Sequence, residues 1–289
     1  MATRSYYKTS HSRHGGHTSL NITDPIQFNT AEESHTHALK TLNALLQYDD
    51  FMLSIGNVLD VGCGPGLDLE WWASRTTRDT EMPEPLNIKC TGIDLFPSLV
   101  LPDYYTPQEK ITYSKFNMED DWIMDHMTYK DLDKQYDVVW CHDVFQYAIN
   151  PLKTLQNFYN LLSPGGMLAL MIPQTTNVIY HRQEFNQVDG TFYNHTLVSL
   201  IHMLAISRFD CKAGFFRKAP DDPWISAIVY KPEEEMDVLD PRTTRWYDLV
   251  DLGLLPNSAD AGIQKAGHLR QRDLVLPWLN KSLTDYAQQ

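Results

Sequence analysis

The residues whose types and spacing point most directly to chemistry lie between positions 58 and 66. The mostly apolar residues 58–61 predict a short buried strand, and the run 67–73 predicts a helix. Between them, glycine recurs at every second position, at Gly62, Gly64 and Gly66. A strand that passes through a glycine turn into a helix brings the backbone close to a ligand at the carboxyl end of a parallel sheet. Glycine suits that turn because it accepts positive φ and has no side chain to block a bound molecule.

The spacing of the glycines excludes two common nucleotide-binding turns. A dinucleotide fingerprint, G-x-G-x-x-G, would need glycine where the chain has Leu67. A phosphate-binding G-x-x-x-x-G-K-[ST] is absent, with no lysine near the turn. The remaining pattern, D-x-G-x-G-x-G starting at Asp60, resembles the first motif of the class I S-adenosylmethionine-dependent methyltransferases. A purely structural turn is the alternative, and the rest of the chain must decide between them.

The second half of the chain carries a longer resemblance to the same family. The run YDVVWCHDVFQY at 136–147 and the run NLLSPGGMLALMIP at 160–173 resemble the second half of the class I core. Between them, Asn150 and Pro151 predict the start of a helix, with the amide at the cap and proline at the first position. We expect 163–166 to end this helix, and 167–173 to be the fifth strand.

These elements predict an α/β fold, a Rossmann-like sandwich with a seven-stranded sheet over residues 31–230. Apolar patterning predicts the remaining strands at 88–95, 111–116, 136–141, 209–216 and 224–230, and helices near 30–48 and 197–205. The resemblance implies the strand order 3-2-1-4-5-7-6. Residues 1–30 are expected to be a flexible tail, and 231–289 a helical or irregular extension with short helices near 243–253 and 274–287.

The resemblance also implies which residues contact S-adenosyl-L-methionine, whose product is S-adenosyl-L-homocysteine. An acidic side chain at the tip of the second strand, Asp94, can accept hydrogen bonds from both ribose hydroxyls, although an Asp that is merely solvated is the alternative. Asn117 and Met118 occupy the positions that meet the adenine ring in the family. The full expected set is Asp60, Gly62, Cys63, Gly64, Gly66, Asp94, Leu95, Asn117, Met118, Glu119 and Cys141.

The expected reaction is direct displacement at a methyl group that the positive sulfur already activates, with oxygen or nitrogen as the acceptor. The enzyme's main tasks are then alignment and exclusion of water. If a general base is used, the resemblance implies His142 as the first candidate, since the end of the fourth strand lies near the methyl group in the family, and His181 is the second. Imidazole suits the role because it titrates near neutrality. Asp143 is expected to orient the substrate or the histidine. The polar, aromatic connection 174–195 is expected to close over the acceptor.

A metal is not expected at this site. The chain is also similar to the quinone-pathway O-methyltransferases, where C-x-E-x-L-E-H supplies two carboxylates and a histidine. In this sequence Asp143 keeps the first carboxylate, but Gln146 and Tyr147 replace the other two groups. One carboxylate and a neutral amide make a poor nest for a hard cation, which prefers several charged oxygens.

Composition narrows the class of acceptor without naming it. Hydrophobic residues make up 43% and charged residues 21%, as in globular proteins, and the formal net charge of −13 does not favour nucleic acid. No apolar run approaches a membrane span, and the amino terminus lacks an apolar signal segment, which predicts a cytoplasmic protein. Four cysteines without C-x-x-C spacing predict buried free thiols. A small-molecule acceptor is favoured.

Two alternatives remain open. The chain could modify a protein, RNA or DNA, with Lys265, Arg270 and Arg272 forming a docking patch. It could instead bind the cofactor without catalysing transfer, as a partner of another protein. The sequence does not indicate the oligomeric state.

Overall fold

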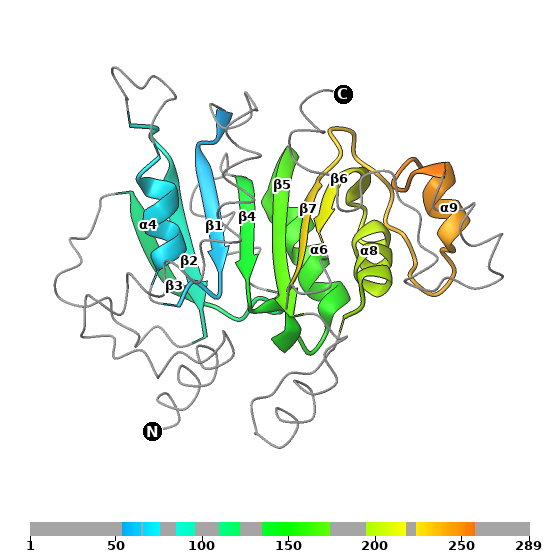
Figure 1. Ribbon diagram of the computed structural model, residues 1–289, viewed down its shortest axis with the longest axis horizontal. Helices are drawn as coiled ribbons and strands as arrows, with labels where there is room; N and C mark the ends of the chain where they lie inside the picture. Colours follow the sequence, from blue (N-terminus) through cyan, green and yellow to red (C-terminus); the bar gives the residue numbers. More distant parts are fainter. Residues whose placement is uncertain are drawn as a thin grey trace.

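The structure, a computed structural model, describes residues 54–64, 66–75, 85–95, 110–121, 135–173, 195–217 and 224–257. They form a seven-stranded sheet in the order β3-β2-β1-β4-β5-β7-β6, which confirms the predicted fold (Figure 1). The strands are β1 (Asn57–Val61), β2 (Lys89–Asp94), β3 (Ile111–Lys115), β4 (Tyr136–His142), β5 (Leu162–Pro173), β6 (Asp210–Arg217) and β7 (Trp224–Tyr230). The helical elements are α4 (Leu67–Ala73), the 3-10 turn η1 (Phe145–Tyr147), α6 (Pro151–Leu161), α8 (Leu197–Ile206) and α9 (Trp246–Asp251).

The strand pairing brings the ends of three strands together. β1 lies between β2 and β4 and is parallel to both, so the carboxyl ends of all three meet at one edge of the sheet. β3 adds to β2 in parallel, and β5 adds to β4 in parallel. β7 is antiparallel to both β5 and β6. The chain order reverses at β1 and β4, where open α/β sheets bind their ligands.

Helices cover both faces of the sheet (Figure 1). On one face, α4 packs its buried Leu69 and Trp72 against Val58 and Val138, which point to that side from β1 and β4. On the other face, α6 and α8 cover a larger apolar cluster that includes Leu59 and Val139. Because side chains alternate along a strand, neighbouring residues of β1 and β4 fill different halves of the core.

The four cysteines divide between the same two halves. Cys63 and Cys90 belong to the cluster on the α4 face, and Cys141 and Cys211 to the cluster beneath α6 and α8. All four are buried and free, which confirms the expectation from the sequence.

The start of the fifth strand was predicted wrongly. Helix α6 begins as predicted, with the Asn150 side chain accepting a hydrogen bond from the Lys153 backbone amide and Pro151 in the first turn. However, β5 starts at Leu162, opposite Tyr136, and the next aligned pair is Val138 with Met167. Residues 163–166 therefore form an irregularity within the strand, and this Pro-Gly-Gly segment is not a loop between helix and strand.

Residues 231–257 are part of the same packed structure. The backbone amide of Gly165 donates to the carbonyl of Lys231, and that of Cys211 donates to Leu254. Leu249, Leu254 and Leu255 are buried in the cluster beneath α6 and α8. Helix α9 falls within the predicted 243–253 segment, whereas the helices predicted near 30–48 and 274–287 lie outside the described residues. No helix among the described residues has the length and apolar character needed to cross a membrane.

Candidate functional site

The glycine turn joins β1 to α4 and is fastened to the end of β2. Gly62, Gly64 and Gly66 all have positive φ, at 72°, 50° and 86°. The backbone amides of Gly62 and Cys63 both donate to the carbonyl of Ile93, at 2.7 and 3.2 Å. At Gly66 a side chain would be strained by the positive φ, and its Cβ would lie 2.3 Å from the Tyr113 hydroxyl on β3, so that tyrosine would have to move. The turn is a fixed loop of bare backbone at the carboxyl edge of the sheet.

Asp94 lies at the tip of β2 and faces this turn, as predicted. Its Oδ2 accepts a hydrogen bond of 3.1 Å from the backbone amide of Gly64. The residue remains partly exposed, and the next residue, Leu95, has 45% of its surface exposed. The carboxylate is therefore oriented by the turn, with an accessible apolar side chain beside it.

Two further aspartates lie near the same turn, on β1 and at the start of α4. Asp60 is 2% exposed, and its Oδ2 has no hydrogen-bond partner among the described residues. Burial raises the pKa of Asp60 well above its usual range, and the charges of Asp68 and Asp94 raise it further. A buried carboxylate that lacks a partner and lies near two others is a costly arrangement unless a cation accompanies it. This group of acids therefore fits a positively charged ligand.

Asp68 is the site residue that the sequence analysis missed. Its Oδ2 accepts a 2.8 Å hydrogen bond from Nε1 of Trp140 and lies 3.3 Å from Nδ1 of His142. Both partners are on β4, two residues apart, and so point to the same face. Burial lowers the pKa of His142, but the hydrogen bond and charge of Asp68, with the charge of Asp143, outweigh it, so the net shift is upward. His142 is thus at the predicted edge, and a carboxylate on α4 contacts it.

Asp143 follows β4 in a left-handed conformation, with φ of 55°. Its backbone amide donates to the carbonyl of Met171, at 3.0 Å. Its carboxylate accepts a hydrogen bond from the side-chain amide of Gln146, which also donates to the Asp143 carbonyl at 2.9 Å. Non-glycine residues in this region of φ concentrate at functional sites. The amide of Gln146 partly offsets the negative charge that Asp143 brings to this edge.

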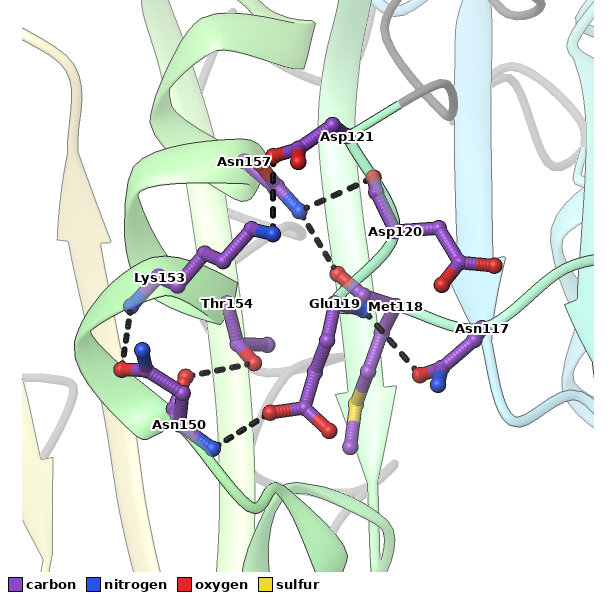
Figure 2. A network of polar contacts seen from close by, with 9 residues as sticks. All are labelled: Asn117, Met118, Glu119, Asp120, Asp121, Asn150, Lys153, Thr154 and Asn157. Carbon is purple, nitrogen blue, oxygen red and sulfur yellow. Dashed lines mark hydrogen bonds and ion pairs between the residues drawn. The ribbon is translucent and has the colours of Figure 1, made fainter.

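Helix α6 holds in place the loop after β3, which contains Asn117, Met118 and Glu119 (Figure 2). Asn117 folds this loop locally, because its Oδ1 accepts from the Glu119 amide at 3.1 Å. From α6, the side chain of Asn157 donates to the carbonyl of Met118 at 2.9 Å. The Glu119 carboxylate accepts from the backbone amide of Asn150, and the 2.7 Å ion pair of Lys153 with Asp121 adds a further contact. The loop is therefore fixed by the first turns of α6.

Three other predicted residues are Cys63, Cys141 and His181. Cys63 lies at the turn, and burial raises the pKa of its thiol, followed by the nearby charges of Asp60 and Asp94, so it is not a nucleophile. Cys141 is fully buried on the opposite face of the sheet, away from Asp68 and His142. His181 and most of the 174–195 connection lie outside the described residues.

The family comparison decides between a structural turn and a cofactor turn. Residues 31–215 match the model of a methyltransferase domain family, which spans the sheet, the glycine turn and β4. The chain belongs to this family. It has the fold of the class I S-adenosylmethionine-dependent methyltransferases, and the cofactor of this family is S-adenosylmethionine. The narrower likeness to the quinone-pathway O-methyltransferases is not confirmed.

Two kinds of relative accompany the family match. Trans-aconitate 2-methyltransferases from two strains of Rhodopseudomonas palustris are each 26% identical, over 161 residues (54% of this chain, 52% of the relative) and 164 residues (55% and 53%). The chain thus spans about half the length of the curated relatives it matches. Among solved structures, a putative sarcosine dimethylglycine methyltransferase from Galdieria sulphuraria has a TM-score of 0.51 at 13% identity, over 70% of this chain and 88% of that one. The structural likeness shows the fold alone.

The site of this family member suits its cofactor in charge. S-adenosylmethionine carries a sulfonium and an ammonium group, and Oδ2 of Asp60, which has no hydrogen-bond partner among the described residues, lies in a group of acids suited to them. Gly62, Gly64 and Gly66 add no side chains of their own at this turn.

Proposed function

We propose that the chain transfers the methyl group of S-adenosylmethionine to an oxygen or nitrogen of a small-molecule acceptor. The observation that carries the proposal is Asp60, a buried acid near the end of β1 whose Oδ2 has no hydrogen-bond partner among the described residues. Burial and the charges of Asp68 and Asp94 raise its pKa, and a cationic cofactor bound beside these acids would favour its ionised form. When bound, the cofactor supplies an electrophilic methyl group on positive sulfur, and the chain supplies alignment and exclusion of water.

Two observations support a small acceptor. The curated relatives carry the name of trans-aconitate, a small organic acid. The net charge of −13 also opposes binding of long polyanions. A protein or nucleic-acid acceptor, and a role as a non-catalytic partner, are outcomes that the experiment below would reveal.

His142 is the proposed general base for an acceptor that must lose a proton. It lies at the end of β4, and its net pKa is raised by Asp68 and Asp143 against the effect of burial, which strengthens the imidazole as a base. An acceptor that is already ionised, such as a carboxylate, has no such proton, so its methylation would not depend on this residue. The dependence on His142 therefore reports the kind of acceptor.

The transfer is proposed to need no metal. Gln146 points its amide hydrogens at the Asp143 carboxylate, which is the opposite of what a cation nest requires. Among the residues that the structure describes, no group of three or more histidines, cysteines or acids is placed to hold a metal ion. We expect a chelator to leave the rate unchanged, and activity lost in EDTA and restored by magnesium would contradict this part of the proposal.

The decisive experiment combines binding with transfer. Calorimetric titration with S-adenosylmethionine is run beside a transfer assay with methyl-labelled cofactor and separate pools of small acids, phenols, amines, peptides and RNA. We expect binding, and label in a small-molecule pool. Binding without label in any pool would identify a non-catalytic partner. Label in peptides or RNA alone would replace the acceptor class, and absence of binding would overturn the proposal as a whole.

A further inference from the structure

Asp68 connects the cofactor turn to the proposed base. It is the second residue of α4, two positions after Gly66. Its Oδ2 meets both the Trp140 indole, at 2.8 Å, and the His142 imidazole, at 3.3 Å. The residue is separated from these partners by 72 and 74 positions in the sequence, so only the folded sheet brings them together.

The carboxylate itself is held rigidly. Trp140 is 2% exposed and makes an edge contact with the fully buried Trp72 of α4, with ring centroids 6.2 Å apart. The rings of Trp140 and His142 are also in edge contact, at 6.2 Å. The indole N–H can only donate, so its hydrogen bond to Asp68 fixes the carboxylate as an acceptor. A carboxylate fixed in this way can in turn fix the histidine.

The partner of the imidazole determines its protonation. The His142 side chain is 7% exposed, so water has little access and the neighbouring carboxylate sets the tautomer. A carboxylate accepts hydrogen bonds, which places the proton of the neutral ring on Nδ1 and leaves the lone pair on Nε2. Among the described residues, the charges that act on the imidazole are those of Asp68 on α4 and Asp143 after β4, whereas Met171 pairs with His142 from β5 without charge.

We infer that Asp68 is the positioning residue for His142, holding Nδ1 protonated so that Nε2 is the nitrogen that accepts the proton of the acceptor. This inference rests on the proposed function, in which His142 is the base. In the transfer step, the acceptor's oxygen or nitrogen forms a bond to the methyl carbon and its proton passes to Nε2, while the carbon–sulfur bond breaks with its electron pair going to sulfur. The resulting imidazolium is stabilised by the facing Asp68 carboxylate.

The first test needs neither cofactor turnover nor an acceptor. Nitrogen-15 NMR of the histidine rings in the full chain is followed through a pH titration, in wild type and in Asp68→Asn. We expect wild-type His142 to be protonated at Nδ1 when neutral, and its pKa to fall in the variant because the facing carboxylate charge is removed. His202, which stacks on Trp246 at the far side of α8, should titrate identically in both proteins and serves as an internal control.

A neutral His142 protonated at Nε2 in the wild type would overturn the inference, and this result does not depend on whether the variant folds. An unchanged His142 pKa in a folded Asp68→Asn protein would also overturn it. These outcomes are separate from failure of the proposed function, which would appear as wild-type protein that binds cofactor and transfers no methyl group.

The second test uses the transfer reaction with a hydroxyl or amine acceptor. In Asp68→Asn, measured at saturating S-adenosylmethionine, we expect kcat to fall at least about tenfold. The rate requires neutral His142, so it rises with pH through that pKa. The acid limb of the profile should therefore move to lower pH in the variant while the plateau falls. A fall in rate with an unmoved acid limb would show a merely structural role and would contradict the inference.

Discussion

At the scale of single residues, the three aspartates near the glycine turn differ in what already satisfies them. Asp94 accepts a hydrogen bond from the Gly64 amide, and Asp68 is engaged with Trp140 and His142. The Oδ2 of Asp60 has no partner among the described residues. Asp94 is therefore oriented for a ligand's hydroxyl groups, Asp68 for a side chain, and Asp60 for a cation.

Asp94→Ala should weaken binding of S-adenosylmethionine by about ten- to a hundredfold, because hydrogen bonds to a charged acceptor contribute roughly 1.5–3 kcal/mol. Calorimetry measures the change. Asp251→Ala, which removes an exposed carboxylate from the end of α9, is the control and should bind as wild type. A folded Asp94→Ala protein with unchanged affinity would remove this residue from the site.

Asp60→Asn should stabilise the cofactor-free protein while weakening cofactor binding. The pKa of Asp60 is raised in the folded protein, chiefly by burial, so its contribution to stability falls as pH rises from the unfolded pKa through the folded one. The neutral amide removes that cost, and each 1 kcal/mol gained corresponds to roughly 2–4 °C in Tm. Thermal unfolding at neutral pH measures it.

Asp137→Asn is the matched control for this experiment, with the opposite sign expected. The Asp137 carboxylate accepts from the backbone amides of Gly56 and Asn57, at 2.7 and 2.9 Å, so its loss should lower Tm. If Asp60→Asn lowered Tm in the same way, the carboxylate would be a satisfied structural group and not a site held for a cation.

Only part of this arrangement of aspartates could be predicted from the sequence. Asp60, Asp94 and the glycines could be predicted because they stand in one local pattern with a fixed spacing. Asp68 could not, because it reads as an ordinary polar residue in the first turn of a helix. Its role depends on which face of β4 turns towards α4, and that follows from the sheet register.

At the scale of elements, the glycine turn is held by its neighbours as much as by its own backbone. Ile93 of β2 accepts two of its amides, and Tyr113 of β3 covers Gly66. The turn was predicted from spacing alone. Its cover by Tyr113 was not, since β3 is reached only through the order of the strands. Likewise, the Pro-Gly-Gly segment at 164–166 predicts a break, and only pairing with β4 shows that the strand has already begun.

Gly66→Ala and Gly253→Ala separate backbone strain from loss of the site. Both glycines have positive φ, at 86° and 74°, so both substitutions should destabilise the fold to a similar extent. At Gly66 the added carbon meets the Tyr113 hydroxyl, whereas at Gly253 none of the described residues lies within 4 Å of it. We expect Gly66→Ala to lose cofactor binding and Gly253→Ala to retain it, as calorimetry would show. Equal affinities would mean that the turn tolerates a side chain.

At the scale of the whole molecule, the described part of the segment after β7 completes the core. Leu254 is 2% exposed, and its carbonyl accepts from the Cys211 amide of β6 at 3.0 Å. The cluster beneath α6 and α8 therefore includes residues beyond the last strand. Sequence patterning predicted a short helix here and gave no sign of which leucines face inward.

Leu254→Ala should lower the free energy of unfolding by about 2–5 kcal/mol, because it leaves a cavity in a packed core. Leu252→Ala, two residues earlier and 46% exposed, should change it by no more than about 0.5 kcal/mol. Urea unfolding of both variants measures the difference. Equal small effects would show that the segment merely lies on the surface.

Because two cysteines lie on each face of the sheet, their reactivity can report local opening of each half of the core. Burial raises the pKa of every thiol, to about 12 at Cys90, so alkylating reagents find almost no thiolate in the closed molecule. Each modification then reports an opening event. The pair of cysteines that reacts shows whether the α4 side of the core or the side beneath α6 and α8 has opened. Mass mapping after brief labelling should show Cys63 and Cys90 reacting together when α4 lifts, and slower reaction of Cys63 once cofactor holds the turn. Cys141 and Cys211 would be modified only when α6 and α8 separate from the sheet. One alkylating reagent therefore distinguishes opening on the two faces of the sheet in the same experiment.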